Sequence, residues 1–256
     1  MPMPSPRSSA GDPARSLELL WRDSAATSRR GPAQALSVDA VVVAAIALAD
    51  QEGLEAVTMR RVAEGLGVAP MTLYTYVPGK AELLDLMLDT AYGWMSRTDT
   101  TGRSWRERLV VVAEENRALY EAHPWVAGVS TVRPPLGPGL MAKYEHELRA
   151  FEGLGLGDVQ MDASLTFLLN FVRACAQGAS DTRAAKQDSA LDDEEWWAAN
   201  APLLARVFDR SRYPTAARVG AASGAANGSA YSPEHAYAFG LERVLDGLAV
   251  LVDASG

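Results

Sequence analysis

Cationic and hydroxyl side chains gather in one short segment, residues 58–77, which reads TMRRVAEGLGVAPMTLYTYV and is closely followed by Lys80. Cations and hydroxyls are the groups with which proteins bind the phosphate oxygens of nucleic acids. From Thr58 to Lys80, three basic residues accompany a single acid, Glu64, so this stretch carries a charge of +2. The segment therefore predicts a contact with nucleic acid.

The chain as a whole is acidic, with a formal charge of −8 over 256 residues. Residues 1–80 hold eight basic and eight acidic side chains, whereas residues 81–256 hold sixteen and twenty-four. The acidity therefore belongs to the larger, C-terminal part of the chain and does not exclude DNA as a partner. It predicts modest non-specific affinity for DNA and a shallow salt dependence.

No arrangement of residues in the sequence points to catalysis or to a metal site. The histidines His123, His146 and His235 lie far apart, and Cys175 is the sole cysteine, which excludes an internal disulfide and a four-cysteine zinc module. The sequence also lacks an HExxH motif, the residue order of a Ser-His-Asp catalytic triad and a phosphate-binding loop. We therefore predict no catalytic residue, no cofactor and no metal, with residues 123–125 as a helix stop and Cys175 as a buried small hydrophobe.

Helices must position the basic segment, and local signals predict four of them in close order. A supporting helix over Val38–Glu52 has Ser37 as its N-cap, and a short helix over Met59–Gly65 follows it. A third helix over residues 69–76 and a fourth over residues 79–94 complete the set. Two short helices joined by a tight turn and braced by a third form a helix-turn-helix, whose second helix enters the major groove of DNA.

This part of the chain resembles the TetR family of bacterial transcriptional regulators. The similarity lies in AAIALADQEGLEAVTMRRVAEGLGV and MTLYTYVPGKAELLDLMLD, and it is strong over residues 37–95 and weaker beyond. The resemblance implies a helix-turn-helix DNA-binding domain at residues 37–82 and a helical ligand-binding and dimerisation domain at residues 83–256. It further implies a cytoplasmic repressor that leaves a palindromic operator when it binds a small hydrophobic effector.

The resemblance also assigns roles to single residues. Thr58 and Arg60 match positions that touch DNA, and Arg60 is expected at a base edge because arginine to guanine is the commonest specific contact. Lys80 and the two tyrosines match phosphate-binding positions. Ala69 and Pro70 offer only apolar contact, so they do not reveal the operator sequence. The predicted DNA-binding residues are Thr58, Arg60, Arg61, Ala69, Pro70, Met71, Thr72, Tyr74, Thr75, Tyr76 and Lys80.

Helical spacing continues through the rest of the chain, and no alternating pattern of useful length indicates a strand, so the predicted fold class is all-α. Further helices are expected over residues 104–123, 139–154, 158–178 and 233–253. Residues 211–230, which are rich in Gly, Ala and Ser, are predicted to form a flexible loop.

Aromatic and polar residues on these helices are candidates for an effector pocket, because small-molecule sites are mostly apolar with a few placed polar groups. Asn170, which lies between two phenylalanines, is the strongest polar candidate. Ordinary burial in the core remains the alternative for each residue. The candidates are Trp94, Trp105, Tyr120, Trp125, Met141, Phe167, Asn170, Phe171, Trp196 and Trp197.

The two most apolar long helices, residues 158–178 and Pro233–Asp253, are predicted to form the interface of a homodimer. One recognition helix reads too few bases by itself, and a two-fold pair about 34–36 Å apart reads both halves of a palindrome. Burial of both helices within one protomer is the alternative.

Residues 1–36 are rich in Pro, Ser, Gly and Arg and are predicted to form a flexible arm, with the apolar island at 17–21 docking as a short helix. The pair Arg29-Arg30 either enters a minor groove or remains a solvated tail. Because the apolar run at residues 40–49 follows this arginine pair, a twin-arginine export signal is a further alternative. Asp39 and the helical pattern of that run favour the cytoplasm, and ten apolar residues are about half of a membrane span.

Two other functions remain open at this point. A DNA-binding regulator without an effector predicts a filled C-terminal core. An α-helical enzyme with a vestigial helix-turn-helix predicts titratable side chains that converge on one site.

Overall fold

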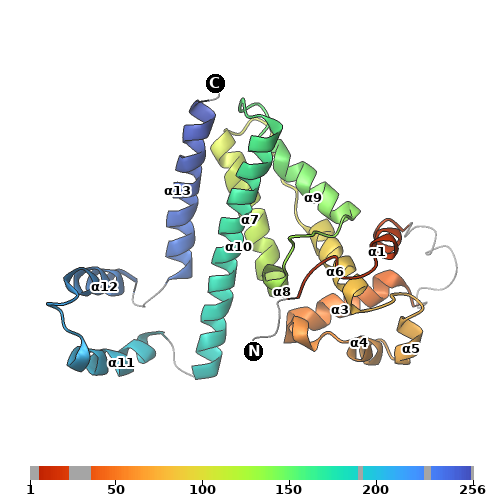
Figure 1. Cartoon of the computed structure of the whole chain (residues 1–256), viewed down its shortest axis with the longest axis horizontal. Coiled ribbons are helices and arrows are strands. Elements are labelled where there is room, and N and C mark those ends of the chain that lie inside the picture. Colours follow the sequence, from red (N-terminus) through yellow and green to blue (C-terminus); the bar gives the residue numbers. More distant parts are fainter. Residues whose placement is uncertain (1–5, 23–35, 190–192, 228–231, 255–256) are drawn as a thin grey trace.

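The computed structural model describes residues 6–22, 36–189, 193–227 and 232–254. Within these ranges every regular element is a helix, apart from one isolated β-bridge between Arg7 and Ser130. Figure 1 shows the helices of residues 38–76 gathered at one end of the molecule and long C-terminal helices beside them. The all-α prediction is confirmed.

The basic segment is carried by three helices, α3 (Val38–Glu52), α4 (Met59–Gly65) and α5 (Pro70–Leu73). The Ser37 hydroxyl accepts a hydrogen bond from Ala40 N (3.1 Å) at the predicted N-cap of α3, and a single 3₁₀ turn (Leu54–Ala56) leads to α4. Gly67 makes the turn to α5 with a φ of +68°, which glycine adopts without steric cost. Helix α5 ends at Leu73, earlier than predicted, and residues 74–76 form a turn.

Helix α6 (Lys80–Trp94) is the central element, because α1 (Pro13–Leu20), α3 and α9 (Pro138–Arg149) all pack against it. Glycine allows α9 to come close, since a Cβ at Gly139 would overlap the backbone carbonyl of Asp89. The Asp89 carboxylate also accepts hydrogen bonds from two backbone N–H groups in the first turn of α9, at 3.1 and 2.8 Å. Helix α6 therefore supplies the N-terminal cap of α9 from outside that helix.

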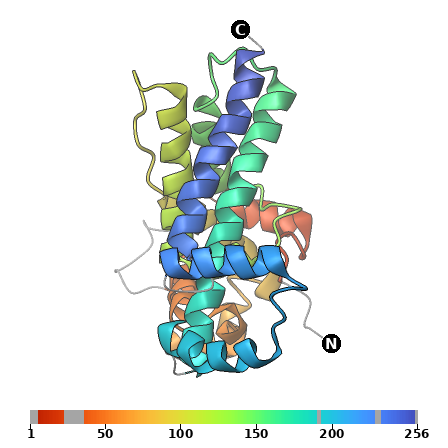
Figure 2. The ribbon, with the colours of Figure 1, turned by 90° about the vertical axis from the view of Figure 1, so that its left-hand side faces the viewer.

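The C-terminal part is built on α7 (Trp105–Ala122), α10 (Asp158–Ser189) and α13 (Pro233–Asp253). Ser104 and Glu107 form a capping box at the start of α7. Figures 1 and 2 show α10 and α13 side by side, with α7 behind them. Helix α10 continues to Ser189, beyond the end predicted at residue 178.

The described residues form two apolar clusters. The first joins α3, α4, α5 and α6 to the short helix α8 (Pro124–Gly128), so the helix-turn-helix shares its core with the neighbouring helices of the larger domain. The second lies between α7, α10 and α13. Tyr120 of α7 packs against both clusters, which are therefore in contact.

Residues 6–22 are built into the molecule, so the prediction of a flexible arm is wrong for this stretch. Two leucines of α1 are buried against α6, as expected for the apolar island. Ser9 N donates a hydrogen bond to Asp85 Oδ1 on α6 (2.7 Å), and the Ser8 hydroxyl donates to the carbonyl of Arg133 (2.6 Å). These partners are distant in sequence, so no local pattern in residues 6–12 could have predicted the contacts. Arg29-Arg30 lies outside the described residues.

Residues 193–227 form two helices, α11 (Asp193–Val207) and α12 (Pro214–Asn227). Figure 1 shows both helices projecting away from α10 and α13. The predicted loop over 211–230 is therefore wrong for residues 214–227. Six alanines in this stretch favour helix strongly enough to outweigh its two glycines.

None of the helices in the described ranges is long and apolar enough to cross a membrane.

Candidate DNA-contacting surface and effector cavity

The predicted DNA-contacting residues lie on one exposed edge formed by α4, α5 and the start of α6, at the lower right of Figure 1. Ten of the eleven are exposed, and Tyr76 is half-buried. Met71 is 75% exposed and Tyr74 45%, so Tyr74 is not the core aromatic that its type would allow. The inward-facing Leu73 and Val77 are fully buried and fix this edge to the first cluster.

The two arginines of α4 have different partners. Arg60 is 81% exposed, and its Nε lies 2.8 Å from Glu64 Oε1, one helical turn along, so the guanidinium can exchange that surface contact for another. Arg61 donates two hydrogen bonds to the carboxylate of Glu52 on α3, at 2.9 and 2.6 Å. These bonds hold the pKa of Glu52 below its ordinary value. Arg61 therefore braces α4 against α3, a role that its place in the sequence did not indicate.

The hydroxyl side chains of this edge also stabilise the backbone. Thr58 Oγ1 accepts a hydrogen bond from Arg61 N (3.2 Å) at the N-cap of α4, and Thr75 Oγ1 donates to Thr72 O (2.7 Å). Lys80 is exposed in the first turn of α6, where free backbone N–H groups and the helix dipole favour an anion. Lysine and helix terminus together are suited to a phosphate.

A polar contact connects α3 to the larger domain. Asp50 of α3 lies 2.9 Å from His123 Nδ1 and accepts a hydrogen bond from Trp125 Nε1 at 2.8 Å. His123 stands between α7 and α8, and Trp94 of α6 packs against its ring at 5.9 Å. Asp50 is more than seventy residues away from its partners along the chain, so no local pattern could have indicated this contact.

A partly open cavity of about 400 Å³ lies at the centre of the larger domain, between α6, α7, α8, α9 and α10. Tyr92 and Tyr120 line it, and burial raises the pKa of both phenols, that of Tyr120 to about 12. Both hydroxyls are therefore protonated at neutral pH. Leu169 and Asn170 of α10 line the opposite wall, with Asn170 exposed on the open side.

Two cationic residues, Lys143 of α9 and Arg173 of α10, also line this cavity. Lys143 Nζ lies 2.6 Å from Glu147 Oε1, and both side chains are nearly buried. Arg173 donates to the carbonyls of Ala127 (2.8 Å) and Val129 (2.7 Å) at the end of α8. The cavity therefore combines aromatic and aliphatic walls with a few fixed polar groups, which is the usual composition of a small-molecule site.

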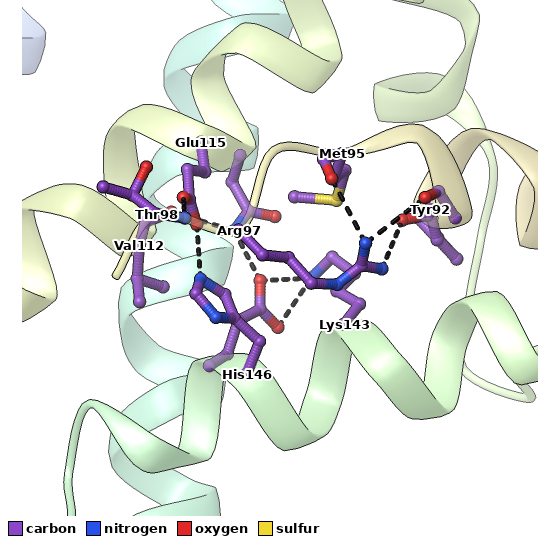
Figure 3. Close-up of polar contacts among 11 residues, drawn as sticks. Tyr92, Met95, Arg97, Thr98, Val112, Glu115, Lys143 and His146 are labelled. Carbon is purple, nitrogen blue, oxygen red and sulfur yellow. Dashed lines mark hydrogen bonds and ion pairs between the residues drawn. The ribbon is translucent and has the colours of Figure 1, made fainter. Parts of the chain in front are cut away.

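The end of α6 that reaches this cavity is held by a network of polar contacts (Figure 3). Arg97 donates hydrogen bonds to the carbonyls of Tyr92 (3.0 Å) and Met95 (3.2 Å) in the last turn of α6. Glu115 of α7 lies between its two partners, accepting from Thr98 N at 2.7 Å and lying 2.7 Å from His146 Nε2 of α9. Tyr92 is therefore fixed relative to both α7 and α9.

The ten predicted pocket residues do not share one site. Tyr120 and Asn170 line the central cavity, and Trp94 lines a second, more open hollow of about 580 Å³ between α6 and α7. Trp125 is a core residue bonded to Asp50, and Phe171 stacks on Tyr237 of α13. The remaining candidates, which the structure places away from the central cavity because they face solvent or the second cluster, are Trp105, Met141, Phe167, Trp196 and Trp197.

Sequence reasoning missed the cavity residues that carry charge and most of those that carry hydroxyls. Lys143 and Arg173 read as exposed positions on amphipathic helices, because nothing local shows that distant helices form a cavity around them. Tyr92 lies within a run of apolar residues on α6 and reads as core. Within the described ranges, no group of three or more histidine, cysteine or acidic side chains is arranged to hold a metal ion.

The face formed by α10 and α13 retains large apolar side chains in contact with solvent. Phe167 on α10 is 53% exposed, and Phe239 on α13 is 57% exposed. Single exposed hydrophobic residues are common, but several on two adjacent helices indicate an interaction surface.

Two family models match the chain. Residues 41–87 match the model described as bacterial regulatory proteins of the tetR family, and residues 98–252 match the tetracyclin repressor-like C-terminal domain. The chain is also 40% identical to the HTH-type transcriptional repressor DrrR1 of Streptomyces coeruleorubidus, over 96% of this chain and 88% of that protein.

Solved structures of ActR from Streptomyces coelicolor are similar to this chain. The apo structure has a TM-score of 0.70 at 24% identity, over 86% of this chain and 98% of ActR. The structure of ActR in complex with actinorhodin has a TM-score of 0.68 at 25% identity, over 84% of this chain and 95% of that one.

Proposed function

Because the chain belongs to the TetR family of bacterial regulatory proteins, we propose that it is a transcriptional repressor that binds a palindromic operator as a homodimer and leaves it when a small molecule fills the central cavity. One observation carries this proposal: a single helix, α6, presents Lys80 at the DNA-contacting edge and Tyr92 in the wall of the cavity. Both sites are thus parts of one rigid element.

The DNA-contacting edge supplies the two kinds of contact that a specific operator requires. Lys80 and the hydroxyls of Thr72 and Tyr74 position the protein on phosphates, while Arg60 and Met71 reach towards base edges. Arg61 is better suited to bracing α4, because its guanidinium is already bonded to Glu52. A protein with this activity works where the chromosome is, in the cytoplasm.

The cavity supports an effector-dependent regulator over one without an effector, for which a filled core would be expected. ActR, which has the same fold, has been solved with actinorhodin bound. The described residues that line the cavity include no histidine, cysteine or carboxylate, and its one lysine, Lys143, is paired with Glu147. We therefore favour binding over catalysis at this site.

The coupling between the two sites runs through α6 and through the contact of Asp50 with His123 and Trp125. An effector changes DNA affinity only to the extent that it prefers one arrangement of these elements. Val126 of α8 lines the cavity and is adjacent to Trp125. A bound molecule that moves α8 therefore also displaces Trp125 relative to its hydrogen-bond partner, Asp50 on α3. Such couplings are typically about 1–3 kcal/mol.

The homodimer is proposed to form through α10 and α13, whose outer face carries Phe167 and Phe239. Two copies related by a two-fold axis would place their recognition helices on successive turns of one face of the duplex.

A selection from random double-stranded DNA with the purified full-length chain tests the proposed function. We expect enrichment of a palindrome whose half-sites are about one helical turn apart, and we expect actinorhodin, used as the probe, to weaken binding to it. Failure to enrich any sequence would refute the proposal. Enrichment of an asymmetric single site would refute the dimeric part of it.

A further inference from the structure

The lining of the central cavity carries positive charge that the protein leaves uncompensated. Lys143 and Arg173 are the two cationic residues on its surface, and no carboxylate of the described ranges lines it. Lys143 is neutralised by Glu147, whose oxygens lie 2.6 and 2.8 Å from its ammonium. Arg173 forms no ion pair with any acidic residue in the part of the chain that the structure describes.

The backbone holds Arg173 in place without neutralising it. Two of its five N–H groups donate to the carbonyls of Ala127 and Val129, and Gln177 donates to the first of these carbonyls from the next turn of α10. The guanidinium is therefore fixed in orientation, with donors left over at the cavity. A half-buried cation in such a position is stabilised by an anion, and a guanidinium binds oxygen anions through paired hydrogen bonds.

Two further residues with donor hydroxyls line the same cavity. The hydroxyls of Tyr92 and Tyr120 have no hydrogen-bond partner among the described residues, although both side chains line the cavity. Both phenols keep their proton at neutral pH and so can donate. Val126, Leu140 and Leu169 supply aliphatic walls between these groups.

From this arrangement we propose that the effector is an apolar compound that carries an anionic oxygen group, which Arg173 binds while the aliphatic walls enclose its apolar part. The proposal deepens the proposed function and rests on it, because it takes the cavity to be the effector site. It excludes cationic amines as the preferred class, since the lining offers them no carboxylate.

Two fluorescent probes that differ by one anionic group provide the test. 1-Anilinonaphthalene-8-sulfonate carries a sulfonate, and N-phenyl-1-naphthylamine has the same rings without it. Titrated into the full-length chain, the sulfonate is expected to bind at least about tenfold more tightly, as a charge-assisted hydrogen bond implies. Equal affinities, tighter binding of the neutral probe, or binding of neither would overturn the proposal.

Three variants assign the preference to this site. Arg173→Gln should abolish the preference for the sulfonate and leave the affinity of the neutral probe within about threefold, while Arg173→Lys should keep part of the preference because it keeps the charge. Thr166→Trp places an indole at the mouth of the cavity and should weaken both probes. Arg149→Gln, on the exposed face of α9, is the matched control and should change neither. A sulfonate preference that survives Arg173→Gln would contradict the assignment.

The two claims fail separately. A chain that enriches a palindromic operator but binds both probes equally remains a repressor with a different effector class. A chain that prefers the sulfonate through Arg173 but enriches no DNA has the anion site without the proposed regulatory role.

Discussion

Asp85 and Asp89, one turn apart on α6, are both buried, and burial raises the pKa of each carboxyl above its ordinary value. Their surroundings differ in one respect. Both oxygens of Asp89 accept hydrogen bonds from backbone N–H groups of α9, whereas Asp85 accepts one from Ser9 N and one from the hydroxyl of Ser16, which can also act as an acceptor. Substitution by asparagine should therefore cost more stability at position 89 than at position 85.

We expect Asp89→Asn to lower the free energy of unfolding by about 1–3 kcal/mol, because its amide N–H₂ would point at a backbone donor. Asp85→Asn should change it by less than about 0.5 kcal/mol at pH 4. Folding raises the pKa of Asp85, so its carboxyl contributes stability below the unfolded value of about 4, and this contribution is lost as the pH rises through the folded value. Urea unfolding of both variants from pH 4 to pH 7 should show that the free energy of unfolding of Asp85→Asn rises relative to that of the wild type as the pH rises. Equal losses for the two variants would contradict the assignment of their partners.

The DNA-contacting edge makes its own prediction at this scale. Lys80→Ala should weaken specific and random DNA alike and reduce the salt slope by about one, because a phosphate contact is lost. Arg60→Ala should weaken the selected operator by about tenfold and alter the base preference at one position. Fluorescence anisotropy with both DNAs at several salt concentrations measures the difference, with Arg149→Ala as a control on an exposed face distant from α4. Uniform losses for both variants would show that Arg60 reads no base.

At the scale of elements, the contact between α6 and α9 depends on glycine at one position. Gly139→Ala places a methyl group against the backbone of α6, which cannot move aside, and should cost about 1–3 kcal/mol or more. Gly93 lies on the other side of the same contact with ordinary van der Waals space around it. Gly93→Ala should be neutral or stabilise by up to about 1 kcal/mol, because alanine favours helix. Thermal unfolding of the two variants checks this, and similar melting temperatures would refute the close packing of these helices.

Elements with local end signals could be predicted from the sequence, and those defined by distant partners could not. Ser37, Thr58 and Ser232 mark helix ends through contacts within a few residues, and α3, α4 and α13 lie where they were predicted. Residues 6–11 show no such signal, because their order comes from Asp85 and from the loop after α8.

The candidate sites divide in the same way. The DNA-contacting edge is a contiguous run of residues, so its exposure and its charge could be predicted together. The cavity is assembled from five helices, and only two of its lining residues, Tyr120 and Asn170, were among the candidates. Residue type alone favoured tryptophans as cavity residues. In the structure, Trp125 is hydrogen-bonded to Asp50 in the core, and Trp196 and Trp197 stack on each other on α11.

At the scale of the whole molecule, the outer face of α10 and α13 should hold two copies together. Phe167→Glu places a charge in the proposed interface and should convert the dimer to a monomer, with operator affinity falling at least about tenfold because both half-sites are no longer bound together. Leu136→Glu, at an equally exposed apolar position outside α10 and α13, is the matched control. Sedimentation velocity checks both, and a dimer that persists in Phe167→Glu would place the interface elsewhere.

The central claim is that the cavity and the DNA-contacting edge are coupled through α6 and the contact of Asp50 with α8. The most direct measurement is the affinity for the selected operator at increasing concentrations of a cavity ligand, with occupancy followed through tryptophan fluorescence in the same sample and actinorhodin as the first probe. We predict that operator affinity falls by about tenfold or more as the cavity fills, and that Asp50→Ala reduces this response while ligand affinity is retained. An operator affinity that stays constant while the cavity goes from empty to saturated would contradict the account.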